Sequence, residues 1–311
     1  ETEVNRFLRQ ASQDTPEFNE MIKELVDRSK QNKLSGVQVA DEDMIHVHVV
    51  SHSHDDVGFR KTLDQYYTGS ADMIIRAGVQ YIFDETIQHL EEDPLKKFTY
   101  VEMAFFMRWW REQTDKTKAS VRRLVKQGQL EFINGGWSMN DEATTHYEDI
   151  ITNMQKGHKF LLEEFGVTPS VGWHIDPFGH SNAQAALFSR MGFDSWYMCR
   201  IDYRDKIKRR DEQNMEFVWT PFFDDRGDKD SIFTHVTYDM YWGLPNFYFD
   251  DMRAEDPIVE GYNMKEMLDQ FATWVLKFSK IYKTKHIFIP MGGDFNYQNA
   301  QTVFMNLDRL I

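Results

Sequence analysis

Short apolar runs rich in β-branched and aromatic residues alternate with longer amphipathic stretches from residue 44 to the end of the chain. Runs of this kind predict buried strands, and the stretches between them have the periodicity of helices. The expected strands are residues 45–51, 98–101, 130–133, 170–174, 195–198, 232–236 and 286–290. The expected helices are residues 62–90, 105–127, 147–165, 182–191, 264–282 and 297–311. Because alternation of this kind builds βαβ units, we expect an α/β fold, a parallel seven-stranded β/α barrel-like domain.

The first 43 residues differ from the rest, since they are polar and charged. One helix is expected there, at residues 16–29, with Thr15 as the cap before Pro16. We therefore expect residues 1–43 to be an N-terminal helical extension and residues 44–311 to be a single α/β domain.

Two highly charged stretches interrupt the alternation, at residues 204–216 and 222–230, and predict exposed loops or a hairpin. The chain ends inside a helical pattern at residues 307–311, where no capping residue follows. This ending predicts that the parent polypeptide continues.

Composition narrows the possible functions. Hydrophobic residues make up 41% and aromatic residues 14% of the 311, enough for a sizeable core. The net charge of −14 argues against nucleic acid as a partner, because phosphates require a basic surface. No apolar run has the length of a membrane span. The single cysteine, Cys199, excludes intramolecular disulfides and a cysteine-based zinc site, and we expect a buried, inert thiol.

Three groups of polar residues follow three predicted strands. The first is His52-Ser53-His54-Asp55-Asp56, the second surrounds Asp176, and the third is Gly292-Gly293-Asp294. Charges beside a buried strand must be paired or bound to metal, and His and Asp are ligands that suit zinc. Because the carboxyl ends of parallel strands converge on one face, these residues can share a pocket.

Two carboxylates near a metal suit hydrolysis. One carboxylate can act as a nucleophile while the other, with a raised pKa, donates a proton, and a metal can hold substrate hydroxyls or act as a Lewis acid. An isolated Asp after a strand is usually a helix cap, and an isolated His-x-His usually serves packing. Three such groups after three strands favour a site. His46 and His48 alternate with apolar residues, and we expect them to be structural.

At these residues the chain resembles the retaining α-mannosidases of glycoside hydrolase family 38, and is nearest to their lysosomal-type branch. The resemblance runs from about residue 44 to residue 311. Its carriers are His52-Ser53-His54-Asp55-Asp56-Val57-Gly58-Phe59, Lys61-Thr62-Leu63-Asp64-Gln65-Tyr66-Tyr67, Asn134-Gly135-Gly136-Trp137, His174-Ile175-Asp176-Pro177-Phe178-Gly179-His180-Ser181 and Gly293-Asp294-Phe295-Asn296-Tyr297.

The resemblance implies a zinc-dependent hydrolase that cleaves α-mannosides of glycans through a covalent intermediate. It implies one Zn²⁺ held by His54, Asp56 and Asp176, with Asp176 also the nucleophile and Asp294 the general acid/base. His52 and Asp55 then support the site or the fold. A retaining mechanism predicts a separation of roughly 5–5.5 Å between the two catalytic carboxyl groups.

The resemblance also implies a substrate pocket that contains Arg200, Tyr238 and Asp239. Phe59 belongs to the same pocket and stands where the family usually has Trp. Phe still stacks on a sugar face, but with less area and without an N–H group, so the difference concerns substrate preference.

The family's fourth zinc ligand is a histidine that lies downstream of residue 311. We therefore expect this ligand from outside the chain, and one or more companion chains from the same precursor as partners. The branch resemblance favours the lysosome or another acidic, secretory lumen.

Other classes stay open at this point. A non-catalytic subunit that keeps the mannosidase fold is compatible with Phe59 and the missing ligand. A metal-dependent polysaccharide deacetylase would need a His-x-x-x-His pair, and the sequence after Asp56 has none. Amidohydrolases would need a metal-bridging lysine and further histidines after later strands, which is not the pattern here.

Overall fold

The computed structural model describes residues 44–222, 227–250 and 255–311. The expected extension at residues 1–43, with its helix at 16–29, lies outside the described residues.

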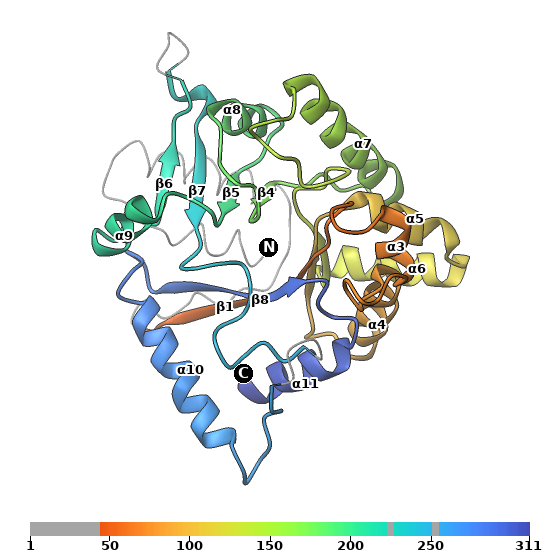
Figure 1. The fold of residues 1–311 in the computed structure, drawn as a ribbon, viewed down its shortest axis with the longest axis vertical. Helices are drawn as coiled ribbons and strands as arrows, with labels where there is room; N and C mark the ends of the chain where they lie inside the picture. Colours follow the sequence, from red (N-terminus) through yellow and green to blue (C-terminus); the bar gives the residue numbers. More distant parts are fainter. Residues whose placement is uncertain (1–43, 223–226, 251–254) are drawn as a thin grey trace.

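The described strands form two four-stranded sheets, in the orders β3-β2-β1-β8 and β4-β5-β7-β6. All strand pairs are parallel except the antiparallel pair of β6 and β7. In Figure 1 the strands of the second sheet lie together above the long paired strands β1 and β8. The strands are β1 (His46–His54), β2 (Phe98–Tyr100), β3 (Leu130–Phe132), β4 (Val171–His174), β5 (Ser195–Met198), β6 (Glu216–Trp219), β7 (Ile232–Val236) and β8 (His286–Asp294).

The fold is therefore mixed α/β with mostly parallel sheets, as expected, but a seven-stranded barrel is not what the described residues form. They contain eight strands in two separate sheets. The strand that the sequence did not predict is β6, an antiparallel edge strand whose last three residues are only partly buried. A short, half-buried strand that follows a charged stretch carries little hydrophobic signal, which explains the omission.

Strands β1 and β8 are longer than predicted. They pair residue by residue from His46 opposite His286 to His54 opposite Asp294. The close pairing depends on Gly292, because a Cβ at that position would lie 1.9 Å from the carbonyl oxygen of His52. The polar residues expected just beyond the strands are thus part of their hydrogen-bonded ladder.

The helices lie between the strands along the chain and cover the sheets (Figure 1). They are α3 (Leu63–Thr68), α4 (Val79–Glu92), α5 (Met103–Glu112), α6 (Asp115–Gln127), α7 (Tyr147–Phe165), α8 (Asn182–Arg190), α9 (Tyr203–Asp211), α10 (Met264–Phe278) and α11 (Ala300–Leu310), with a short 3₁₀ turn η1 (Gly227–Asp230).

Three expectations about helices were wrong. The single helix expected at 62–90 is two, because Gly69 takes a left-handed conformation with φ +80° and ends α3. The helix expected at 105–127 is also two, because Thr114 caps α6. The charged stretch expected as a loop contains α9, which has no buried residue and therefore no apolar periodicity to predict it.

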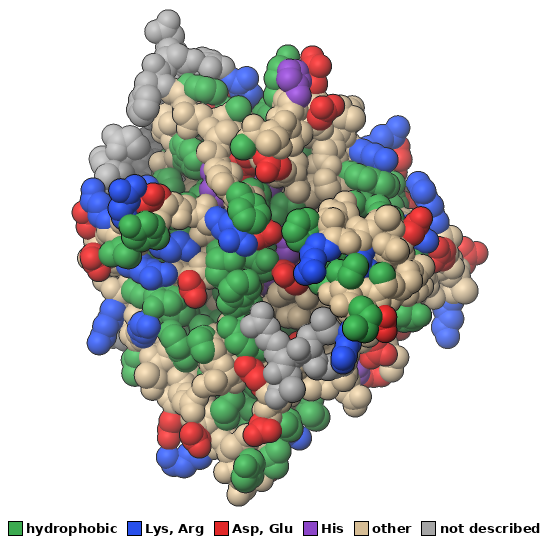
Figure 2. All heavy atoms as spheres, in the orientation of Figure 1, with side chains coloured by type: hydrophobic (Ala, Val, Ile, Leu, Met, Phe, Trp, Pro, Cys, Tyr) green, Lys and Arg blue, Asp and Glu red, His purple; other side chains and the backbone are tan. Residues whose placement is uncertain are grey.

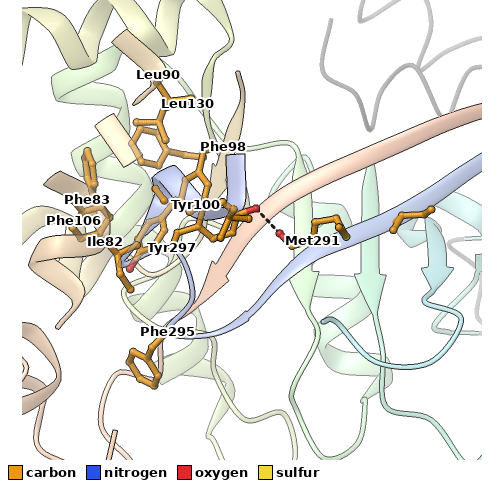
Figure 3. Close-up of a cluster of buried hydrophobic side chains, with 14 of the residues drawn as sticks. Ile82, Phe83, Leu90, Phe98, Tyr100, Phe106, Leu130, Met291, Phe295 and Tyr297 are labelled. Carbon is orange, nitrogen blue, oxygen red and sulfur yellow. Dashed lines mark hydrogen bonds between the residues drawn. The ribbon is translucent and has the colours of Figure 1, made fainter. Parts of the chain in front are cut away.

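Aromatic side chains fill much of the core beside the first sheet. Figure 3 shows Phe83 and Phe106 from the helices meeting Tyr100 of β2. Tyr297 belongs to the same cluster, and its hydroxyl donates to the Met291 carbonyl at 2.7 Å. Burial of one such side chain contributes about 1.5–3 kcal/mol. This packing anchors the segment that directly follows Asp294.

The surface is mixed in character. Figure 2 shows acidic and basic side chains gathered over α9, with hydrophobic side chains between the charged ones. Within the described part of the chain, none of the helices has the length and apolar character that a membrane crossing requires.

Candidate active site

His54, at the end of β1, is buried and faces two carboxylates. Its Nε2 atom lies 3.4 Å from Asp56 Oδ1 and 3.6 Å from Asp176 Oδ2. Ligand atoms of all three residues lie within 4.8 Å of one another, and the described residues contain no other such group of His, Cys, Asp or Glu. Burial alone would lower the pKa of His54, but the neighbouring carboxylates of Asp176 and Asp56 raise it well above its ordinary value. One imidazole nitrogen and two carboxylates fit a divalent metal such as zinc.

Asp176 lies two residues beyond the end of β4 and precedes Pro177, which favours an extended backbone. Arg200 Nε donates to Asp176 Oδ1 at 2.8 Å. Burial would raise the pKa of Asp176, but the adjacent His54 and the hydrogen-bonded Arg200 guanidinium lower it below its ordinary value. The side chain is therefore held as a carboxylate, as a nucleophile requires.

Asp294 ends β8 and is exposed, next to the buried His54 on the neighbouring strand. Its Oδ1 accepts a hydrogen bond from the Tyr241 hydroxyl at 2.8 Å. Burial and the nearby carboxylates of Asp294 and Asp176 raise the pKa of Tyr241, so its hydroxyl remains a donor. The Tyr241 ring also lies 4.9 Å from the His54 ring.

Tyr241 is a site residue that sequence reasoning missed. The two predicted residues of the same segment make other contacts: the Tyr238 ring centroid lies 4.4 Å from that of Phe278, and the Asp239 side chain is exposed. The Asp239 carbonyl accepts from Lys206 Nζ at 2.6 Å. Roles in substrate binding for Tyr238 and Asp239 stay predictions. Nothing in the sequence favours Tyr241 over Tyr238. Only the path of the chain after β7 shows which of the two contacts Asp294.

Two exposed aromatic side chains follow the candidate ligands in sequence: Phe59 comes three residues after Asp56 and Phe178 two residues after Asp176. Phe59 is 79% exposed and Phe178 is 80% exposed. The Arg200 guanidinium lies over the Phe178 ring at 4.5 Å. Exposed rings of this kind beside polar groups suit stacking on a sugar.

His52 and Asp55, the other members of the first polar group, are buried and contact residues other than the three candidate ligands. His52 Nε2 donates to the Tyr241 carbonyl at 2.7 Å, which fixes the position of the Tyr241 backbone. Asp55 accepts from Ser53 Oγ at 2.7 Å, and burial raises the pKa of Asp55 to about 6.

One carboxylate that the sequence did not predict, that of Glu102, lies on the Nδ1 side of His54. Glu102, which follows β2, places Oε1 4.0 Å from His54 Nδ1. Neither carboxylate oxygen of Glu102 has a hydrogen-bond partner among the described residues, and burial raises its pKa well above the ordinary value. As a single Glu after a short strand, it carried no pattern that sequence reasoning could use.

The sequence predicts that His46 and His48 are structural and that Cys199 is buried. His46 and His48 stack on His286, with ring centroids 4.5 and 5.1 Å away, at the opposite end of the paired strands from Asp294. This agrees with a structural role. Cys199 is buried, its Sγ donates to the Asp239 carbonyl, and burial raises its pKa.

Comparisons of the sequence with known proteins lead to one family. A family model described as the N-terminal domain of glycosyl hydrolases family 38 matches residues 44–311. The chain is 49% identical over 276 residues to the lysosomal alpha-mannosidase of Bos taurus and 46% identical over 275 residues to that of Homo sapiens.

These alignments cover 86% of this chain but only 28% and 27% of the two relatives, so the chain spans little more than a quarter of their length. Among solved structures, an alpha-mannosidase from Enterococcus faecalis V583 superposes with a TM-score of 0.62 at 17% identity, covering 86% of this chain and 27% of that one. That likeness shows a shared fold.

Proposed function

The chain belongs to glycoside hydrolase family 38, and we propose that it carries the catalytic site of a zinc-dependent retaining α-mannosidase acting on glycans. The observation that carries the proposal is the convergence of His54, Asp56 and Asp176 on one point. Asp294 lies directly opposite His54 in the neighbouring strand. Residues 44–311 then form the catalytic domain's N-terminal part, preceded by an extension at residues 1–43.

The metal-binding residues in this proposal are His54, Asp56 and Asp176, with a histidine from outside this chain as the fourth ligand. The bound Zn²⁺ would supply Lewis acidity and an attachment point for substrate hydroxyls. Imidazole nitrogens and carboxylate oxygens are both zinc ligands in proteins, so the donor types around this point suit the ion. Companion chains from the same precursor are the proposed source of the missing ligand.

Asp176 is the proposed nucleophile. Arg200 donates to Oδ1, and His54 faces Oδ2, so the carboxylate is oriented and ionised before substrate binds. It attacks the anomeric carbon and forms a glycosyl-enzyme ester as the bond to the leaving oxygen breaks. A carboxyl separation of about 5–5.5 Å from Asp294 is the corresponding geometric prediction.

Asp294 is the proposed general acid/base. It gives its proton to the leaving oxygen in the first step and removes a proton from the attacking water in the second. The Tyr241 hydroxyl orients it at 2.8 Å, so its free oxygen can face the glycosidic bond. Arg200, Phe59, Tyr238 and Asp239 are the proposed substrate-binding residues.

Family membership also sets the proposed location and substrate. The Bos taurus and Homo sapiens relatives are lysosomal alpha-mannosidases, so we propose the lysosome or another acidic lumen as the location and mannose-containing glycans as the substrate. The same membership argues against the polysaccharide deacetylase and amidohydrolase alternatives.

The proposal is tested on the protein at its full natural length with an aryl α-mannoside. Asp176→Asn should lower kcat/KM by more than about 10³-fold, because nucleophile removal acts on this scale. The matched control is Asp202→Asn, an exposed cap of α9 where asparagine caps equally well. Full activity in Asp176→Asn would sink the mechanism, and an inactive wild-type protein without bound zinc would favour a non-catalytic subunit.

A further inference from the structure

A buried carboxylate, Glu142, lies in the segment between β3 and α7 and binds two histidines. The side chain is 1% exposed, and its Oε1 accepts from His174 Nδ1 at 2.6 Å and from His180 Nδ1 at 2.8 Å. Its Oε2 accepts from the backbone N–H of Ser181 at 2.8 Å. Burying a charge is unfavourable unless it is fully hydrogen-bonded, and these three donors meet that need.

The two ends of the loop that carries Asp176 meet at this carboxylate. His174 is the last residue of β4, and Ser181 is the cap of α8, where its Oγ accepts from the Gln184 N–H. Asp176 lies between them in sequence. One side chain therefore joins the start and the end of residues 174–181.

The segment that supplies Glu142 is itself anchored to the same helix. Asn140 Nδ2 donates to Gln184 Oε1 of α8 at 3.0 Å, and both side chains are buried. Asp141 Oδ1 accepts from the backbone of Ala143 at 2.7 Å, which closes a turn around Glu142. Hydrogen bonds of the neighbouring residues therefore fix the backbone around Glu142.

The charge state of Glu142 agrees with this geometry. Burial alone would raise its pKa, but the hydrogen bonds from His174 and His180 lower it below the ordinary value. Because a carboxylate only accepts, both imidazoles present an N–H at Nδ1.

We propose that Glu142 is a positioning residue that clamps the Asp176 loop at both ends and so aims Asp176 at His54 and the substrate. Contacts with His54 and Arg200 orient the Asp176 side chain, but they do not hold the backbone on either side of it. A displacement of about 1 Å at a reacting group lowers the rate by about 100-fold. The catalytic part of this inference rests on the proposed function, whereas the loop geometry does not.

The test compares Glu142→Gln with the wild-type protein at full length. Glutamine keeps the shape, but its NH₂ group cannot accept, so at least one of the three donors loses its partner. We expect kcat to fall about 100-fold, while KM stays within about threefold, because substrate contacts are unchanged. The dissociation constant for Zn²⁺ should rise about 10-fold, since Asp176 would face the metal less accurately. Amide hydrogen exchange should quicken at residues 175–181.

Glu216→Gln is the matched control. Glu216 is also buried and also accepts from a histidine, with Oε1 3.1 Å from His235 Nδ1, but this pair joins β6 to β7. The control variant should unfold at a lower temperature, yet keep kcat, Zn²⁺ affinity and exchange at 175–181 near wild-type values. His180→Ala, which removes one of the three donors, provides a milder test should Glu142→Gln fail to fold.

The outcomes separate the two proposals. The clamp is overturned if Glu142→Gln, or His180→Ala in its place, keeps kcat and Zn²⁺ affinity within about twofold of wild type. It is equally overturned if Glu216→Gln loses as much kcat and Zn²⁺ affinity as Glu142→Gln does. A wild-type protein without mannosidase activity would reject the proposed function alone, and Zn²⁺ affinity together with amide exchange would then decide the clamp.

Discussion

Asp294 pairs with His54 across the parallel ladder of β8 and β1, at the last register position of both strands. The N–H of the next residue, Phe295, donates to the His54 carbonyl at 3.0 Å. Phe295 takes φ +54° at this point and stacks on Tyr66 at 4.6 Å. The ladder therefore fixes the proposed proton donor relative to the proposed metal ligand, and the aromatic core fixes the turn that follows.

Replacing Asp294 should affect substrates according to their leaving groups. Asp294→Asn should lower kcat by about 10²–10⁴-fold on a methyl α-mannoside, because its leaving oxygen needs a proton. The rate of the first step should fall far less on a dinitrophenyl α-mannoside, because its leaving group needs little protonation. Steady-state and burst kinetics with both substrates measure the difference. Tyr241→Phe keeps the ring without the hydrogen bond and should give a smaller effect. Equal losses on both substrates in Asp294→Asn would reject the acid role.

Glu102 should strengthen metal binding through His54. A metal-bound His54 would direct its Nδ1–H at Glu102, whose oxygen lies 4.0 Å away, and such partners typically contribute 10–100-fold in affinity. Glu102→Leu should therefore raise the Zn²⁺ dissociation constant by about that factor in calorimetric titration. Glu102→Gln, which retains an accepting oxygen, is the conservative control. Unchanged affinity in Glu102→Leu would exclude this contact.

Phe59 should contribute to substrate binding by stacking. It is 79% exposed, so its removal costs little packing. Phe59→Ala should raise KM for an aryl α-mannoside by about 2–10-fold, in line with the strength of aromatic contacts. Phe59→Trp should hold or lower KM because its ring has more area. Met73→Ala, at a side chain that is 94% exposed, is the control for general surface effects. A KM in Phe59→Ala that matches this control would place Phe59 outside the substrate site.

His158 should make stability fall in acid. Burial lowers its pKa from 6.5, although its Nε2 donates to the Asn134 carbonyl at 2.8 Å. Below pH 6.5 the unfolded chain takes up a proton that the folded chain refuses, so the free energy of unfolding decreases as pH falls. The slope is at most about 1.4 kcal/mol per pH unit for one group. In denaturant titrations at pH 7 and pH 5, His158→Gln should lose less stability than wild type. An equal or larger loss in the variant would show that His158 does not contribute.

Sequence patterns predicted the strands that position the site, because short β-branched apolar runs such as residues 45–51 are typical of buried or partly buried strands. They did not predict where β1 and β8 end, because His54 and Asp294 are polar and break the apolar pattern. They also joined helices that Gly69 and Thr114 separate, since a single cap weighs little against a long amphipathic stretch.

Some residues of the site could be predicted from the sequence, and others could not. Dense polar groups beside predicted strands indicated a shared site, and the family resemblance implied His54, Asp56 and Asp176 as its metal ligands. The structure brings these three together. Tyr241 and Glu142 could not, because their partners lie 53 residues away in one case and 32 to 39 in the other. These contacts form only when the chain after β7 and the segment before α7 pack against the site.

The central claim, that Asp176 forms a covalent bond to the sugar, is tested most directly by trapping that bond. The full-length protein is incubated with a fluorinated mannosyl fluoride, which slows hydrolysis of the glycosyl-enzyme, and is then digested and analysed by mass spectrometry. The account predicts one added fluoromannosyl group on the peptide that contains Asp176, and none in Asp176→Asn. A label on Asp294 or Asp56, or an active enzyme that stays unlabelled and releases β-mannose, would contradict it.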